Sequence, residues 1–106
     1  MDDVFSVLSD ARRREILKQL AKGELSAGDV RRAHPSVTFG AISQHLKVLE
    51  RAGLVRMRQA GRNRFYETNL EALLPLRQWL DWMWDHSLDR LKQLAESEAA
   101  TPPPPK

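Results

Sequence analysis

The chain has 106 residues, 42% of them hydrophobic and 29% charged, which is the size and composition of one folded domain. It contains no cysteine, so disulfide bonds, thiolate metal sites and thiol redox switches are excluded. No apolar stretch reaches the roughly 18 residues of a transmembrane helix. The N-terminal Met-Asp-Asp lacks the basic and apolar regions of an export signal, so we expect a cytoplasmic protein without membrane insertion.

The net charge of +3 is unevenly distributed along the chain. Residues 11–66 hold thirteen Lys and Arg against four Asp and Glu, whereas the remaining residues hold four against ten. The middle of the chain is therefore +9 and the two ends together are −6. A basic segment of this kind favours a polyanionic partner, most simply nucleic acid. The alternative is that these cations lie on helix faces that merely happen to be solvated and basic.

The first two predicted helices are short and amphipathic. Residues 1–8 have one apolar face, and Ser9-Asp10 supplies an N-cap for a second helix over 11–22. Gly23 ends this second helix. The apolar face of the first helix consists of Val4, Phe5 and Leu8, and that of the second consists of Ile16, Leu17, Leu20 and Ala21.

Two further helices follow, separated by a turn. Residues 26–29 form a capping box, with Asp29 where Glu is usual, and open a short helix that ends before Pro35. Thr38 caps a fourth helix over 39–52, which Gly53 ends. Its inward-facing apolar residues are Ile42, Leu46 and Leu49.

The periodicity then changes from helix to strand. Residues 54–58 and 64–68 alternate, and residues 59–63 are typical of a turn, so the sequence predicts a β-hairpin. A last long helix begins near Asn69 and Pro75 and extends to about Ser97. We expect a single domain over 1–98 and a disordered or polyproline-like tail over 99–106.

This order of elements predicts a winged helix-turn-helix, a mainly α fold with a β-hairpin wing. The face of the fourth helix opposite its apolar stripe is small and polar, and a helix of this kind fits a major groove about 12 Å wide. Any single residue of this polar face, taken alone, could equally be an ordinary surface residue. We expect Phe39, Gly40, Ser43, Gln44 and Lys47 to face the groove, Thr38 to cap toward a phosphate, and His45 to be structural or phosphate-contacting.

The turn of the hairpin is rich in cations. Arg58, Arg62 and Arg64 cluster there with Asn63, where a small core has no use for them. A wing that lies along the phosphate backbone or enters the minor groove would use these side chains. The alternative is a loop that merely increases solubility.

Several segments together resemble the ArsR/SmtB family of bacterial repressors. They are 9–17 (SDARRREIL), 23–30 (GELSAGDV), 41–55 (AISQHLKVLERAGLV) and 61–66 (GRNRFY). The similarity spans about residues 3–97, and it implies a dimeric winged-helix repressor that binds operator DNA. Ala11-Arg12 and Gly40 depart from the residues most frequent in the family; the first change affects helix initiation and the second could alter sequence preference.

The last helix is too apolar for one packing face. On a helical wheel its apolar arc is about 240° wide, against the roughly 100° that a single face requires. The excess indicates a partner, and a second copy is the simplest one. The resemblance agrees, because terminal helices form the dimer interface in this family, and this aromatic-rich helix is similar to the branch that includes the sporulation-delay autorepressor. The expected interface consists of Val4, Phe5, Leu8, Leu76, Trp79, Leu80, Trp82, Met83 and His86.

The sequence predicts neither a metal site nor another cofactor. The last-helix metal site of the family requires Asp-x-His and a later His with an acid, whereas Asp85 and His86 are adjacent here and no His follows. We therefore interpret His86 as interfacial or hydrogen-bonded, and we expect His34, which precedes a proline in a turn, to be solvated.

Catalysis is also not expected. Ser43 and His45 lie two residues apart on one helix, so their side chains diverge by about 200° and form no nucleophile–base pair.

Two classes of function remain. The first is a sequence-specific homodimeric repressor on an inverted-repeat operator, with recognition helices roughly 34–36 Å apart and an inducer or sequestering partner that no motif identifies. The second is an interaction protein whose last helix binds a different partner.

Overall fold

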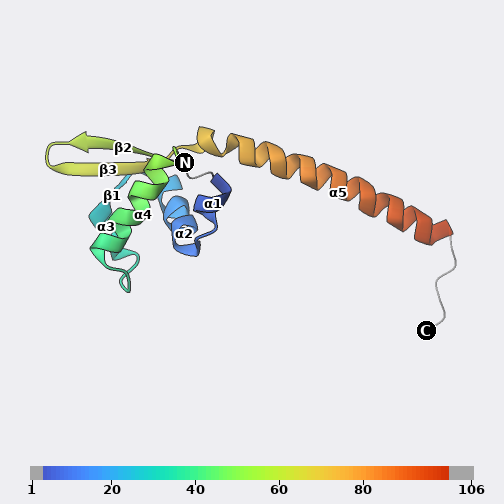
Figure 1. The fold of residues 1–106 in the computed structure, drawn as a ribbon, viewed down its shortest axis with the longest axis horizontal. Coiled ribbons are helices and arrows are strands. Elements are labelled where there is room, and N and C mark those ends of the chain that lie inside the picture. The colour runs from blue at the N-terminus through green and yellow to red at the C-terminus, as the bar shows by residue number, and fades with distance from the viewer. Residues whose placement is uncertain (1–3, 101–106) are drawn as a thin grey trace. The chain divides into compact units, whose positions relative to one another are not determined.

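The computed structural model describes residues 4–100, with side chains for residues 4–97. The chain divides into two units, Met1–Leu74 and Pro75–Lys106, and each is described by itself. In chain order the elements are α1 (Val4–Leu8), α2 (Ala11–Ala21), β1 (Leu25–Ser26), α3 (Ala27–Arg32), α4 (Phe39–Arg51), β2 (Val55–Ala60), β3 (Asn63–Thr68), the 3-10 turn η1 (Leu70–Leu73) and α5 (Leu74–Ala100) (Figure 1).

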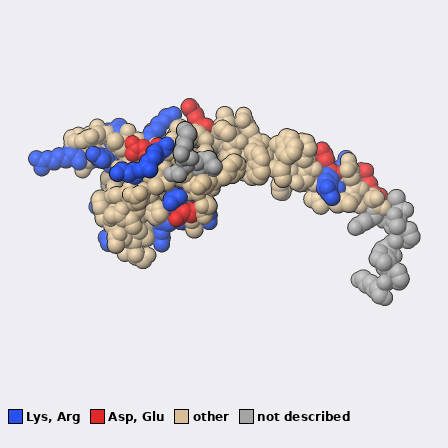
Figure 2. Space-filling view, in the orientation of Figure 1, with Lys and Arg blue, Asp and Glu red and all other residues tan. Residues whose placement is uncertain are grey.

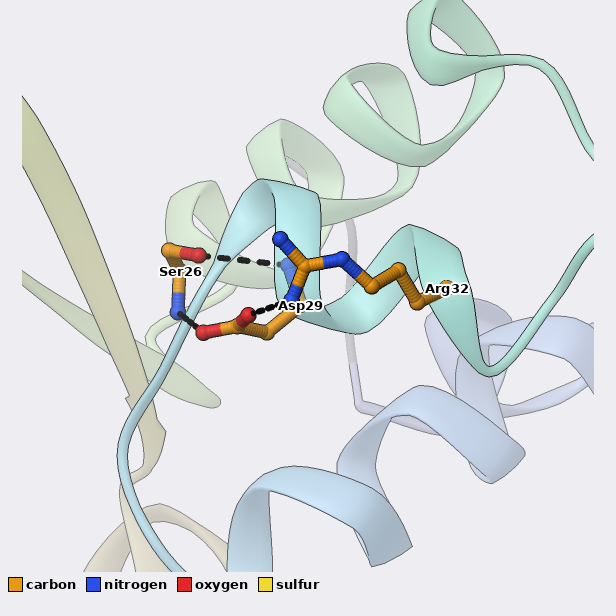
Figure 3. A network of polar contacts seen from close by, with 3 residues as sticks. All are labelled: Ser26, Asp29 and Arg32. Carbon is orange, nitrogen blue, oxygen red and sulfur yellow. Dashed lines mark hydrogen bonds and ion pairs between the residues drawn. The ribbon is translucent and has the colours of Figure 1, made fainter.

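Side-chain caps begin three of the helices at the predicted residues. The carboxylate of Asp10 accepts from the backbone N–H of Arg13 at 3.1 Å, and the hydroxyl of Thr38 accepts from that of Ala41 at 3.1 Å. At α3 the capping box is complete, because Ser26 and Asp29 each accept from the other's backbone N–H. Figure 3 shows this box, with the guanidinium of Arg32 donating to the free side of the Asp29 carboxylate.

The sheet has three antiparallel strands in the order β1-β3-β2, one more than the predicted hairpin. Leu25 pairs with Tyr66 in the added strand β1. The hairpin pairs as far as Ala60 and Asn63, so its strands are longer than predicted and only Gly61 and Arg62 form the turn. Gly61 has φ +62°, and a glycine first in a two-residue hairpin turn is typical of type II′.

One hydrophobic core joins the helices to the sheet. Helix α2 packs on β3 and α4 packs on β2, with α3 against α4. The predicted apolar stripes of α2 and α4 supply most of the buried side chains. The core consists of Val7, Ile16, Leu17, Leu20, Val30, Ile42, Leu46, Leu49, Leu54, Val55 and Tyr66.

Helix α1 contributes to this core differently from the prediction. Val7, which the sequence pattern left out, is fully buried, and Val4 and Leu8 are partly buried against the core. Phe5 is 55% exposed. The predicted apolar face of three residues is therefore divided between the core of the same chain and the surface.

Helix α5 is long, and its apolar side chains cover most of its circumference and leave a polar strip of Gln78, Asp81, Asp85, Asp89, Lys92 and Glu96. Its 27 residues span about 40 Å, and it ends at Ala100 rather than near Ser97. The rest of the predicted tail, 101–106, lies outside the described residues. The exposed large apolar side chains of α5 are Leu74, Trp79, Leu80, Trp82, Met83, Trp84, Leu88, Leu91 and Leu94.

Candidate nucleic-acid interface

Helix α4 has the two faces that the sequence predicted. Ile42, Leu46 and Leu49 are buried, which holds the helix by one side. The opposite side is open to solvent and consists of Phe39, Gly40, Ser43, Gln44 and Lys47. Because its first turn is fixed by the Thr38 cap, the N-terminal end of this exposed side is held in a defined orientation.

This exposed side of α4 forms one wall of a cleft of about 630 Å³. The wing supplies the opposite wall with Arg62, Asn63 and Arg64, and the start of α3 closes the end. The full lining is Ser26, Ala27, Gly28, Phe39, Gly40, Ser43, Gln44, Lys47, Glu50, Arg62, Asn63, Arg64 and Tyr66. Eight predicted contact residues are thus brought to a single concave surface.

Three of the predicted site residues do not line the cleft. Thr38 lies just before α4 and His45 is half-buried toward α2, where the guanidinium Nε of Arg13 donates to its Nδ1 at 3.4 Å.

Arg58, the third of these residues, donates twice to the Glu24 carboxylate, at 3.0 and 2.6 Å, and its guanidinium lies 4.9 Å from the centre of the Phe65 ring. These contacts hold the pKa of Glu24 below its ordinary value. Arg58 therefore fastens the wing to the segment before β1.

The cations of the basic segment include two groups with different surroundings. Arg12, Arg13 and Arg14 on α2 donate to His34, Val7 and Leu8 respectively, so they tie elements of the same chain together. Lys47, Arg62 and Arg64 form no ion pair within the described residues, and all three line the cleft. Figure 2 shows Lys and Arg side chains at the free end of the hairpin.

His34 is not solvated, contrary to the sequence-based expectation. It lies in the turn between α3 and α4 with 7% of its surface exposed. A guanidinium of Arg12 donates to its Nδ1 at 2.8 Å, and because a guanidinium cannot accept, that nitrogen carries no proton. The proton is on Nε2, which donates to the Gln19 side-chain oxygen at 3.1 Å. His34 is buried because α2 covers the turn and supplies both hydrogen-bond partners.

This buried imidazole makes the fold sensitive to acid. Burial lowers the pKa of His34, the charges of Arg12 and His45 lower it further, and Glu15 opposes them. As the pH falls, the unfolded chain therefore binds a proton on His34 before the folded chain does. The stability that the neutral His34 contributes is complete above about pH 6.5 and is lost as the pH falls through the lower folded pKa. Urea unfolding between about pH 7.5 and 5 should show a smaller acid loss for His34→Gln than for wild type.

Lys22→Gln, at an exposed position outside the core, is the control for this measurement and should keep the wild-type acid loss. Identical pH dependence of His34→Gln and wild type would contradict the assignment of the acid loss to His34.

Within α5, His86 has partners on its own helix. Its Nδ1 lies 2.8 Å from the Trp82 carbonyl oxygen, and its ring stacks on the Trp82 ring with centroids 4.0 Å apart. In the described part of the chain, no three His, Asp or Glu side chains gather closely enough to hold a metal ion. No helix of residues 4–100 combines the length and apolarity needed to cross a membrane.

Sequence reasoning missed part of the cleft. Glu50 belongs to the exposed side of α4, one turn after Lys47, and its helical spacing could have placed it there. Ser26, Ala27 and Gly28 reach the cleft only because β1 pairs with β3 and so brings the start of α3 beside the hairpin. No local pattern predicts that contact.

The fold and this cleft together define a winged helix-turn-helix DNA-binding protein. The sequence pattern of bacterial regulatory proteins of the arsR family matches residues 10–57. The HTH-type transcriptional regulator Rv2034 of Mycobacterium tuberculosis is 42% identical over 97 residues, which are 92% of this chain and 90% of that protein. The chain therefore belongs to the ArsR family of transcriptional regulators.

Two further relatives agree with this assignment. The transcriptional repressor SdpR of Bacillus subtilis is 32% identical over 80 residues, covering 76% of this chain and 88% of the repressor. The homodimeric winged helix-turn-helix DNA-binding domain Mb0332 of Mycobacterium bovis, solved by NMR, superposes with a TM-score of 0.62 at 28% identity and covers 77% of this chain and 75% of that domain. The family and fold predicted from the sequence are confirmed.

Proposed function

We propose that the chain is a homodimeric repressor that binds an inverted-repeat operator through the cleft between α4 and the wing. The observation that carries the proposal is the cleft itself. Its α4 wall exposes the polar side chains of Ser43 and Gln44 together with Phe39 and Glu50. Three cations that line it, Lys47, Arg62 and Arg64, have no ion pair among the described residues. Such a surface is complementary to a polyanion with hydrogen-bonding edges.

The two walls of the cleft have different tasks in this proposal. Gln44 and Ser43 enter the major groove and bond to base edges, with Lys47 at the groove margin. Thr38 lies near a phosphate at the start of α4, and His45 keeps α4 in place through Arg13. Arg62, Asn63 and Arg64 contact phosphates or the minor groove, while Arg58 positions the wing.

The dimer forms through the terminal helices in this proposal. α5 exposes Trp79, Leu80, Trp82 and Met83, which a second copy would cover. The structural relative from M. bovis is homodimeric, which supports a dimer of this chain. Phe5 is the most exposed apolar side chain that α1 contributes. A twofold dimer places two α4 helices roughly 34–36 Å apart, one turn of DNA.

This function needs no catalytic step and no bound cofactor. Because its proposed partner is chromosomal DNA, we expect the protein in the cytoplasm. The domain that carries it comprises residues 1–98, with 99–106 as a tail outside it. SdpR, one of the repressors among its relatives, supports repression as the direction of control.

Two substitutions separate the tasks of the walls. Gln44→Ala should bring the affinity for a duplex selected from a random-sequence pool closer to that for a scrambled duplex, because base edges carry the specificity. Arg62→Ala should weaken binding to both duplexes alike and reduce the dependence on salt, because phosphates carry no sequence information. Fluorescence anisotropy at two salt concentrations measures both effects.

Lys22→Ala, an exposed cation outside the cleft, is the matched control for Arg62→Ala and should leave both affinities unchanged. Equal loss of selectivity in Gln44→Ala and Arg62→Ala would contradict the division of tasks. If the wild type selected no duplex over scrambled DNA at either salt, the interaction-protein alternative, based on the exposed α5, would replace the proposal.

A further inference from the structure

Phe39 is an exposed aromatic side chain inside the polar cleft. The described large apolar side chains that are exposed before α5 are Phe5, Phe39 and Leu70. Of these, Phe39 alone lines the cleft, with 55% of its surface open to solvent. It is the first residue of α4, so the Thr38 cap fixes its position.

Folding does not account for the phenyl ring. Phe39 belongs neither to the buried core nor to the partly buried side chains packed against it. A hydrophobic staple across the start of α4 would join the residue before the cap to the fourth helical residue, which are Val37 and Ile42. Both of these already pack in the core. An exposed ring beside them adds nothing to helix entry.

The next residue, Gly40, leaves space beside the ring. A Cβ built at Gly40 would meet no atom of the chain within 4 Å, so no internal contact requires glycine there. Glycine favours a helix less than alanine does, and here that disadvantage has no compensating contact within the described chain. A flat partner that approaches the start of α4 from outside would use this opening.

The chemistry of the major groove limits what an apolar ring can contact there. Guanine, cytosine and adenine present only hydrogen-bonding groups and ring C–H edges, whereas thymine presents an exposed methyl group on C5. The unpaired cations Lys47, Arg62 and Arg64 on the cleft rim favour a polyanion over an apolar protein segment as the occupant. Ser43, one turn after Phe39 on the same side, supplies a hydroxyl for the neighbouring polar edge.

We propose that Phe39 contacts the 5-methyl group of a thymine in the major groove and makes that thymine part of the sequence preference. This inference rests on the proposed function, because it requires α4 to enter the groove. Gly40 admits the base edge beside the ring, and the ring covers the methyl group from water.

The test replaces thymines of the selected duplex one at a time by deoxyuridine, which removes the methyl group and leaves pairing and phosphates unchanged. For the wild type, one deoxyuridine in a single half-site should weaken binding about three- to fivefold, the effect of losing one buried methyl group. Phe39→Ala should bind the thymine and uracil duplexes equally. Ser43→Ala, the matched control on the same side, should keep the thymine preference.

The outcomes separate this inference from the proposed function. A wild type that prefers the selected duplex over scrambled DNA but tolerates uracil at every position overturns the contact and leaves the function intact. A wild type without preference for the selected duplex overturns the function itself. A thymine preference that persists unchanged in Phe39→Ala assigns the methyl group to another residue and overturns the role of Phe39.

Discussion

Replacing Leu80 and Met83 together by glutamate is expected to convert the dimer to a monomer and to weaken operator binding about 10²–10⁴-fold. Both residues lie in the middle of the apolar arc of α5 and are exposed in the single chain. Burying two carboxylates in an apolar interface is strongly unfavourable unless they find partners. Once the subunits separate, each half-site is bound without the effective concentration that the second supplies.

Sedimentation equilibrium and anisotropy on the selected duplex measure this effect. The matched control is Gln78→Glu with Lys92→Gln, which changes the net charge by the same amount on the polar strip of α5. The control should remain dimeric with wild-type affinity. A Leu80→Glu/Met83→Glu variant that still sediments as a dimer would contradict the proposed interface.

Leu46→Ala is expected to lower the free energy of unfolding by about 2–5 kcal/mol. Leu46 is 1% exposed and belongs to the core on the inner side of α4. Its truncation removes buried apolar surface and leaves a cavity that the surrounding helices fill only in part. Since a domain of this size has about 5–15 kcal/mol in total, the variant should be partly unfolded at moderate urea concentrations.

Urea unfolding at one fixed protein concentration measures this loss, because the stability of a dimer depends on concentration. The neighbouring Lys47→Ala is the matched control. Lys47 is exposed on the cleft, so its loss should weaken DNA binding while leaving the unfolding midpoint nearly unchanged. Equal stability of Leu46→Ala and wild type would contradict the position of Leu46 in the core.

The accuracy of the sequence-based predictions followed the range of the interaction. The caps at Asp10, Ser26 and Thr38 act over three residues, and each was found where the sequence predicted it. The buried side of α4 follows from helical geometry alone, since Ile42, Leu46 and Leu49 recur at its period. The exposed polar side of the candidate site follows from the same geometry.

The errors concern contacts between residues far apart in the chain. His34 was expected in solvent because its neighbours form a turn, yet Arg12 and Gln19 of α2 bury and bond it. Glu24 also bonds to Arg58, 34 residues later in the chain, a contact that the local pattern did not indicate. A local pattern contains no information on which side chains meet across such distances.

The sequence by itself determined the helices and the hairpin, the buried sides of α2 and α4, and the basic character of the middle of the chain. Caps, turns and periodicity depend on residues a few positions apart, so the local sequence is enough to specify them. The tertiary structure decided which of the cations remain unpaired. Packing of α2 and pairing of β1 bring arginines beside internal acceptors, whereas Lys47, Arg62 and Arg64, which line the cleft, have no ion pair among the described residues.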